Sequence, residues 1–105
     1  MSVGDLDILR QAFCNTALQK VGGFDRDKFK IDFSGNLSAR LDKYLSRLCE
    51  AANKMNAVEG DDLALKTALL MVRSHAMSLS SFFDAIVEDS EFLLKNGTWM
   101  EFSDS

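Results

Sequence analysis

The apolar pattern is most regular between Asp61 and Lys95, a stretch without glycine or proline. Its apolar residues recur in alternating steps of four and three, the spacing of one face of an α-helix. Only Ser90 interrupts this line, which consists of Leu65, Leu69, Val72, Ala76, Leu79, Phe83, Ile86 and Leu93. A second stripe makes the first half apolar on another side and consists of Leu63, Leu70 and Met77. We therefore expect a central helix over residues 61–95 that is covered from more than one direction.

The length of this helix constrains the shape of the molecule. At ~1.5 Å per residue it would measure ~50 Å, whereas a compact domain of this size has a radius of gyration of ~13 Å. Either the helix breaks near residues 78–81, where Ser81 and Asp84 have the spacing of a capping box, or the molecule is elongated. Because the apolar line continues through this region and the serines lie off it, we expect one continuous helix.

A second helix is predicted over residues 37–57, directly after Asn36, a residue type that commonly caps helix N-termini. Its apolar line keeps the same steps and consists of Leu37, Leu41, Tyr44, Leu48, Ala51, Met55 and Val58. Glu59 and Gly60 interrupt the pattern, and an aspartate that can cap the next helix follows. The two long helices should form an antiparallel hairpin with a short turn, in which Leu48 and Leu69 face each other and are buried.

The N-terminal part of the chain is predicted to form a helix over residues 5–21, with an inner face of Leu6, Leu9, Phe13, Ala17 and Val21. Gly22 and Gly23 end it, because glycine takes the left-handed conformation at helix ends without penalty. Residues 22–36 are irregular, but apolar and charged positions alternate within residues 28–33 and indicate a short extended segment. Such a segment lies flat on the helices, pairs with the C-terminal tail, or pairs with another chain.

These elements predict a single all-α domain over residues 1–105. We expect a three- to four-helix bundle, built on the antiparallel hairpin, with the N-terminal helix packed across it. Hydrophobic residues make up 47% of the chain, which is enough for a core. Asn96 and Gly97 end the last helix, and an apolar tail follows over residues 98–102.

The net charge of −4 argues against nucleic acid as a partner, because nucleic-acid-binding domains usually present a basic surface. No apolar run reaches the length of a membrane span, and the N-terminus lacks the regions of a secretory signal. We therefore expect an intracellular, cytoplasmic protein with no membrane partner. Cys14 and Cys49 lie within predicted helices and are interpreted as reduced thiols rather than as a disulfide.

Candidate catalytic chemistry is limited by the presence of a single histidine, His75. Cys14, Cys49 and His75 lack the spacing of a metal site, so we expect no enzyme activity, no metal and no other cofactor. With a histidine on a helix of an acidic helical module, the chain resembles the histidine phosphotransfer domains. This resemblance implies an alternative regulatory role for His75. In that family a lysine and small residues follow the histidine, whereas residues 76–79 of this chain contain no lysine.

Large apolar residues near the C-terminus are the main candidates for partner binding. The hairpin turn places the start of the second helix opposite the residues just after position 80 of the last helix. Later residues of the last helix therefore project beyond the second helix. Phe92, Trp99 and Phe102 would then fold back or contact another chain, either a second copy or a different protein. Arg40 and Arg47 would either pair with neighbours or water, or orient a partner helix. We therefore expect a non-enzymatic protein–protein interaction module, such as an adaptor, an assembly subunit or a small chaperone.

Overall fold

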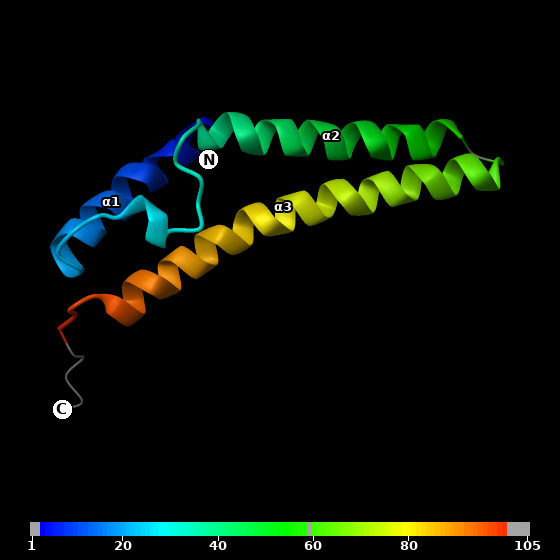
Figure 1. Cartoon of the computed structure of the whole chain (residues 1–105). Coiled ribbons are helices and arrows are strands. Elements are labelled where there is room, and N and C mark those ends of the chain that lie inside the picture. The colour runs from blue at the N-terminus through cyan, green and yellow to red at the C-terminus, as the bar shows by residue number, and fades with distance from the viewer. Residues whose placement is uncertain (1–2, 59, 101–105) are drawn as a thin grey trace, which may run out of the picture.

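The computed structural model of the chain describes residues 3–58 and 60–100, and these residues form helices and connecting segments with no strand. The helices in chain order are the 3-10 helix η1 (Val3–Asp7), α1 (Ile8–Lys20), the 3-10 helix η2 (Arg26–Lys28), α2 (Leu37–Ala57) and α3 (Asp62–Asn96). Figure 1 shows α2 and α3 as an antiparallel pair, with α1 beyond the start of α2 and above the second half of α3. The predicted all-α class, with a hairpin and a third helix, is confirmed.

Both hairpin helices begin at a side-chain cap. The Asn36 side-chain oxygen accepts a hydrogen bond from the Ala39 amide at 2.7 Å, and the Asp61 carboxylate accepts one from the Ala64 amide at 3.1 Å. Each cap satisfies one of the amides that a helix start leaves without a partner. Gly60 has a φ of +90°, a conformation that is accessible to glycine and lets the chain turn back between α2 and α3.

One seam on each helix forms the contact within the hairpin. On α2 the predicted line from Leu37 to Val58 is buried or half-buried throughout. On α3, every second residue of the predicted apolar line lies in the seam, and the residues between them do not. The seam of α3 is buried or half-buried and consists of Leu65, Ala68, Val72, His75, Leu79, Phe82, Ile86, Asp89 and Leu93. At its end, Asp89 binds the extended segment and Leu93 belongs to the core that α1 and this segment form on α3.

The other predicted seam positions of α3 lie one residue further along the helix and are exposed; they are Leu69, Ala76 and Phe83. Leu69 is 53% exposed, so the predicted buried contact between Leu69 and Leu48 was wrong. At Leu69, small residues account for the difference, because Ala51 of α2 and Ala68 of α3 are both buried in the seam. Small side chains let two helices approach closely, and the bulkier neighbour of Ala68 is left outside.

The unbroken α3 makes the molecule elongated. The helix passes through residues 78–81 without interruption, and the molecule measures 62 × 32 × 27 Å with a radius of gyration of 18.9 Å. Of the two shapes that the sequence allowed, the chain adopts the elongated one. The turn end of the hairpin therefore consists of α2 and α3 alone, as Figure 1 shows.

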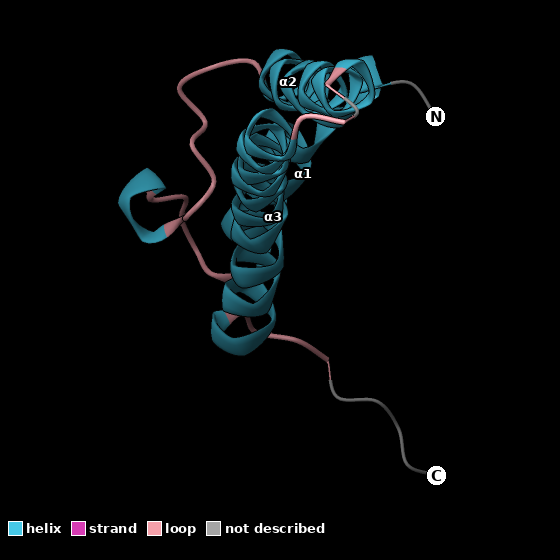
Figure 2. Ribbon diagram, turned by 90° about the vertical axis from the view of Figure 1, so that its right-hand side faces the viewer, coloured by secondary structure: helices cyan, strands magenta, loops and turns pink. Residues whose placement is uncertain are grey.

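The main core lies at the other end, where α1 and the segment between η2 and α2 pack on α3. Phe29, Ile31 and Phe33 are buried, whereas Lys30 and Asp32 between them are exposed. The predicted alternation is confirmed, and of the three predicted arrangements the segment takes the one in which it lies on the helices. Figure 2 shows this segment, together with η2, on one side of the three helices.

The start of the C-terminal tail folds back onto the end of α1. The Thr98 amide donates a hydrogen bond to the Lys20 carbonyl at 2.7 Å, and the Trp99 indole N–H donates to the Leu93 carbonyl at 3.0 Å. The Lys20 ammonium lies 5.2 Å from the centre of the Trp99 ring. Gly97 permits this path, because a Cβ atom there would lie 2.6 Å from the indole nitrogen.

Candidate functional site

A buried aspartate of α3 holds the extended segment in place. Asp89 is only 1% exposed, and its two carboxylate oxygens accept hydrogen bonds from the amides of Lys30 at 2.7 Å and Ile31 at 2.8 Å. The apolar line predicted for this helix leaves out Asp89, so the sequence analysis missed this role. The available signal was its spacing, since Asp89 lies three residues after Ile86 and four before Leu93.

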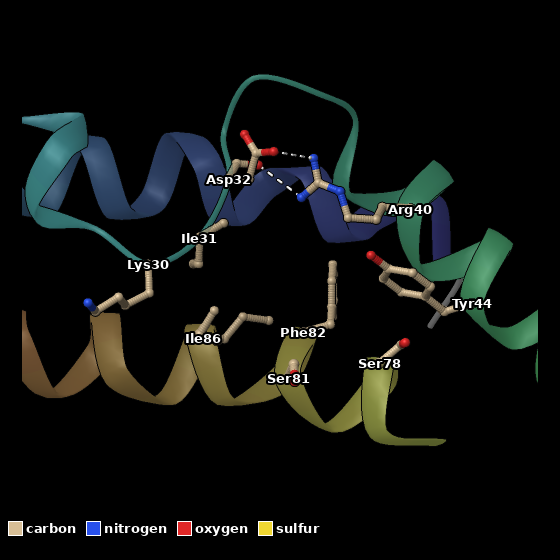
Figure 3. A pocket seen from close by; sticks show the side chains of 10 residues that line it. Lys30, Ile31, Asp32, Arg40, Tyr44, Ser78, Ser81, Phe82 and Ile86 are labelled. Atoms are coloured by element: carbon tan, nitrogen blue, oxygen red, sulfur yellow. Dashed lines mark hydrogen bonds and ion pairs between the residues drawn. The ribbon is translucent and has the colours of Figure 1, made fainter. Parts of the chain in front are cut away.

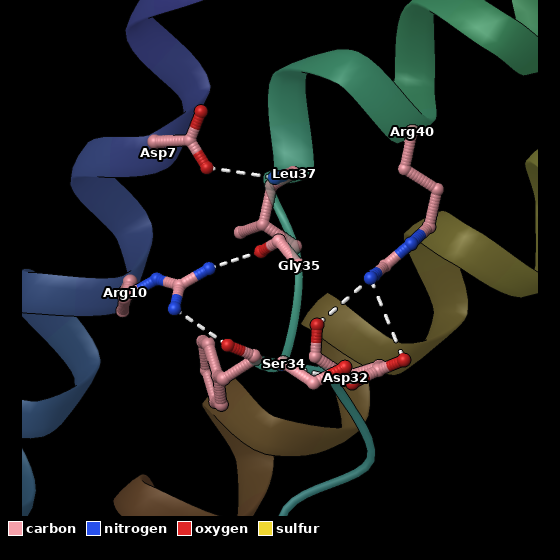
Figure 4. A network of polar contacts seen from close by, with 8 residues as sticks. Asp7, Arg10, Asp32, Ser34, Gly35, Leu37 and Arg40 are labelled. Carbon is pink, nitrogen blue, oxygen red and sulfur yellow. Dashed lines mark hydrogen bonds and ion pairs between the residues drawn. The ribbon is translucent and has the colours of Figure 1, made fainter.

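A network of polar contacts connects η1, α1 and α2 to the same segment (Figure 4). Asp7 accepts hydrogen bonds from the Leu37 amide at 2.7 Å and the Ser38 amide at 3.3 Å, so it caps the start of α2 from outside that helix. Arg10 donates to the carbonyl oxygens of Phe33 and Gly35. The network fixes where α2 begins relative to α1.

On α2, Arg40 belongs to this network. Its guanidinium donates to the Asp32 carbonyl at 3.0 Å and lies 3.5 Å from the Asp32 carboxylate. Arg40 therefore pairs with a neighbour in the single chain, and its contact with a partner helix stays a prediction. Arg47, seven residues further, is exposed.

Both acidic groups of the network have lowered pKa values. The Ser34 hydroxyl and amide donate to Asp32 and hold the pKa of its carboxyl below the ordinary value of 3.8, and the Arg40 guanidinium adds to this. The pKa of Asp7 is held below 3.8 first by the Ser38 hydroxyl and then, against desolvation, by the Leu37 and Ser38 amides. The Ser38 hydroxyl is buried and completes no hydrogen bond of its own, so its effect is that of a nearby dipole.

The lowered pKa of Asp32 predicts a loss of stability in acid. A carboxyl whose pKa is lower in the folded chain than in the unfolded chain contributes stability above its unfolded pKa, and this is lost as the pH falls through the folded value. Asp32→Asn keeps an acceptor for Ser34 but removes the charge. We expect its free energy of unfolding to fall less than that of the wild type between about pH 5 and pH 2. Urea unfolding across this range measures the difference, and parallel pH profiles would contradict the assignment.

A cleft lies beside this network, between the extended segment, α2 and α3 (Figure 3). It has a volume of about 360 Å³, and its lining includes Lys30, Arg40, Tyr44, Ser78 and Ser81. These groups offer hydroxyls and an ammonium to a small polar molecule. Among the described residues that line the cleft, Asp32 supplies the one carboxylate, and there is no histidine or cysteine.

His75 and the cysteines are separate from this cleft. His75 occupies a seam position of α3 and is half-buried. Cys14 is half-buried on α1, Cys49 is exposed on α2, and both are free thiols. Within residues 3–58 and 60–100, no three potential ligands among histidine, cysteine, aspartate and glutamate are grouped as a metal site. The phosphotransfer alternative for His75 stays untested.

Phe92 and Trp99, two of the C-terminal candidates for partner binding, contact other parts of the chain. Phe92 is half-buried, and its ring packs edge-on against Phe29 with centroids 5.3 Å apart. Trp99 takes the predicted folded-back arrangement but stays 41% exposed. Phe102 lies outside the described residues. A partner contact through Phe92, Trp99 or Arg47 therefore stays a prediction.

A different apolar surface lies along the hairpin, and we call it the open face. On both α2 and α3, each residue of this face comes one position after a seam residue in the sequence. Because equivalent positions of two antiparallel helices lie on the same side of the pair, these residues share one face. All of them are exposed, and they are Leu45 and Ala52 of α2 with Leu69, Ala76 and Phe83 of α3.

The two faces of the hairpin differ in character. The residues that precede the seam positions include Arg40, Arg47 and Lys54 on α2 and Ser78 on α3. This face contains the polar cleft and meets the extended segment. The open face is on the opposite side of α3 and continues toward the C-terminus with Val87, which is 53% exposed. Sequence reasoning placed most of these apolar residues in the core and so missed the open face.

Comparisons with known protein families, with curated proteins and with solved structures find no match to this chain. In the part of the chain that the structure describes, no helix combines the length and the apolar character needed to cross a membrane.

Proposed function

We propose that the protein is a non-enzymatic protein–protein interaction module, an adaptor or assembly subunit, that binds a helical partner along the open face of its hairpin. The observation that supports this most directly is the row of exposed apolar side chains on α3. Leu69 and Phe83 are 53% and 48% exposed although each is large and apolar. Contiguous exposed apolar side chains of this kind are typical of interaction surfaces.

The geometry of the open face suits a helix. Leu69, Ala76 and Phe83 are spaced by seven residues, so they form a straight row along α3. A third and a fourth helix placed on such a row complete a bundle, which is the arrangement that a two-helix hairpin needs to cover its second apolar side. Burying a large apolar side chain contributes ~1.5–3 kcal/mol, so a few such contacts give a useful affinity.

Site-specific photo-crosslinking in the native cell tests this proposal. The photoreactive residue p-benzoylphenylalanine is placed at Phe83, at Leu69, or at Lys43, an exposed residue on the other flank of α2. We expect a discrete protein adduct from Phe83 and Leu69 and much less from Lys43. Equal adduct yields at all three positions, or none, would remove the open face as a binding surface. Mass spectrometry of the adduct identifies the partner.

A further inference from the structure

The charges beside the open face repeat in a way that makes α3 complementary to itself. Lys66 and Arg73 lie seven residues apart along its outer edge in the first half of α3, and Asp84 and Glu91 lie seven apart along the same edge in the second half. All four side chains are exposed. None of them forms an ion pair with another residue among those described in the chain.

The spacing of these charges defines one register. The pairs Lys66 with Glu91 and Arg73 with Asp84 share a single midpoint on the helix, between Ser78 and Leu79. Suppose that a second α3 runs antiparallel to the first, with a two-fold axis at this midpoint. Each basic residue of one copy then faces an acidic residue of the other, and the symmetry forms each pair twice. A parallel arrangement would instead place like charges together, which is unfavourable.

The same register also matches the apolar residues. Leu70 of one copy is level with Val87 of the other, and Phe83 is level with Ser74, two positions before Ala76; both of these residues are small and leave room for the ring. Both Leu70 and Val87 are exposed in the single chain. The Leu70–Val87 pair therefore supports the alignment that the charges define.

We propose that the partner bound along the open face is a second copy of this chain, joined to the first by an antiparallel α3–α3 contact centred on residues 78–79. This inference rests on the proposed function and names the partner for it. The self-complementary charges carry the choice of partner, because a different protein would not require the two halves of α3 to match each other. The dimer is isologous, so the same patch serves on both copies.

Charge reversal provides the test. One variant carries Lys66→Glu and Arg73→Glu, and the other carries Asp84→Lys and Glu91→Lys. Each variant alone should self-associate about tenfold or more weakly than the wild type at low salt, because cross-chain attractions become repulsions. Mixed in equal amounts, the two variants should form a heterodimer, since every reversed residue then meets its opposite. Analytical ultracentrifugation of the variants, their mixture and the wild type measures this.

Matched controls separate this contact from a general effect of charge. Lys43→Glu with Lys54→Glu, and Asp27→Lys with Asp42→Lys, change the net charge equally at exposed positions outside the α3 edge. They should leave the dimer constant within a few-fold. Circular dichroism confirms that every variant is folded.

Three outcomes overturn the self-pairing. They are a wild type that stays monomeric at high concentration, control variants that weaken association as much as the α3 variants, and a mixture that fails to restore the dimer. If the photo-crosslink from Phe83 then captures a different protein, the proposed function remains and only the choice of partner fails. If Phe83 and Leu69 yield no specific adduct either, both proposals fail.

Discussion

Asp89→Ala is expected to reduce the free energy of unfolding by roughly 1–6 kcal/mol, because the buried Ile31 amide and the partly buried Lys30 amide lose their acceptor, at up to ~1–3 kcal/mol each. The carboxylate accepts from the Lys30 and Ile31 amides, and it is almost completely buried. A domain of this size is typically stable by ~5–15 kcal/mol, so the variant should approach the limit of folding. Urea unfolding followed by circular dichroism gives the difference.

Two companion variants make the Asp89 prediction specific. Asp89→Asn retains one acceptor oxygen but turns an N–H group toward the second amide, so its loss of stability should be intermediate. Glu88→Ala changes the exposed neighbour and should stay within about 0.5 kcal/mol of the wild type. Hydrogen exchange provides a second measurement, because the Lys30 and Ile31 amides should lose protection in Asp89→Ala. If Asp89→Ala were as stable as Glu88→Ala, the carboxylate would have no anchoring role.

Local sequence patterns predicted the elements of this fold well. Helix α2 begins and ends at Leu37 and Ala57, as expected, because Asn36 caps it and glycine follows it closely. The alternation around Phe29, Ile31 and Phe33 also correctly indicated which side chains are buried. In each case the determining interactions are short-range, so they are visible in a few consecutive residues.

The phase of α3 could not be read in the same way. Hydrophobicity favours a line through Leu69, Ala76 and Phe83 over one through Ala68, His75, Phe82 and Asp89. The seam follows the second line, because a small alanine allows close helix packing and the aspartate has amide partners from a distant segment. Both reasons depend on tertiary contacts. The candidate site was missed for the same reason, since the open face is made of residues assigned to the core.

A matched pair of leucine substitutions in α3 tests which line is the seam. Leu79 is 8% exposed and Leu69 is 53% exposed, and both lie inside the same helix. Leu79→Ala should cost ~2–5 kcal/mol through lost burial and the cavity left behind, whereas Leu69→Ala should change stability by less than about 0.5 kcal/mol. Helix propensity contributes equally to both variants, so the difference reports burial alone.

Protein concentration gives this comparison a second use. Unfolding is measured at dilute concentrations where sedimentation shows a monomer, so the intrinsic stability of the hairpin is compared. A costly Leu69→Ala with a harmless Leu79→Ala would mean that the seam follows the more hydrophobic line after all. At higher concentrations Leu69→Ala should weaken association while leaving the monomer intact, because the exposed leucine then contributes to the contact between chains.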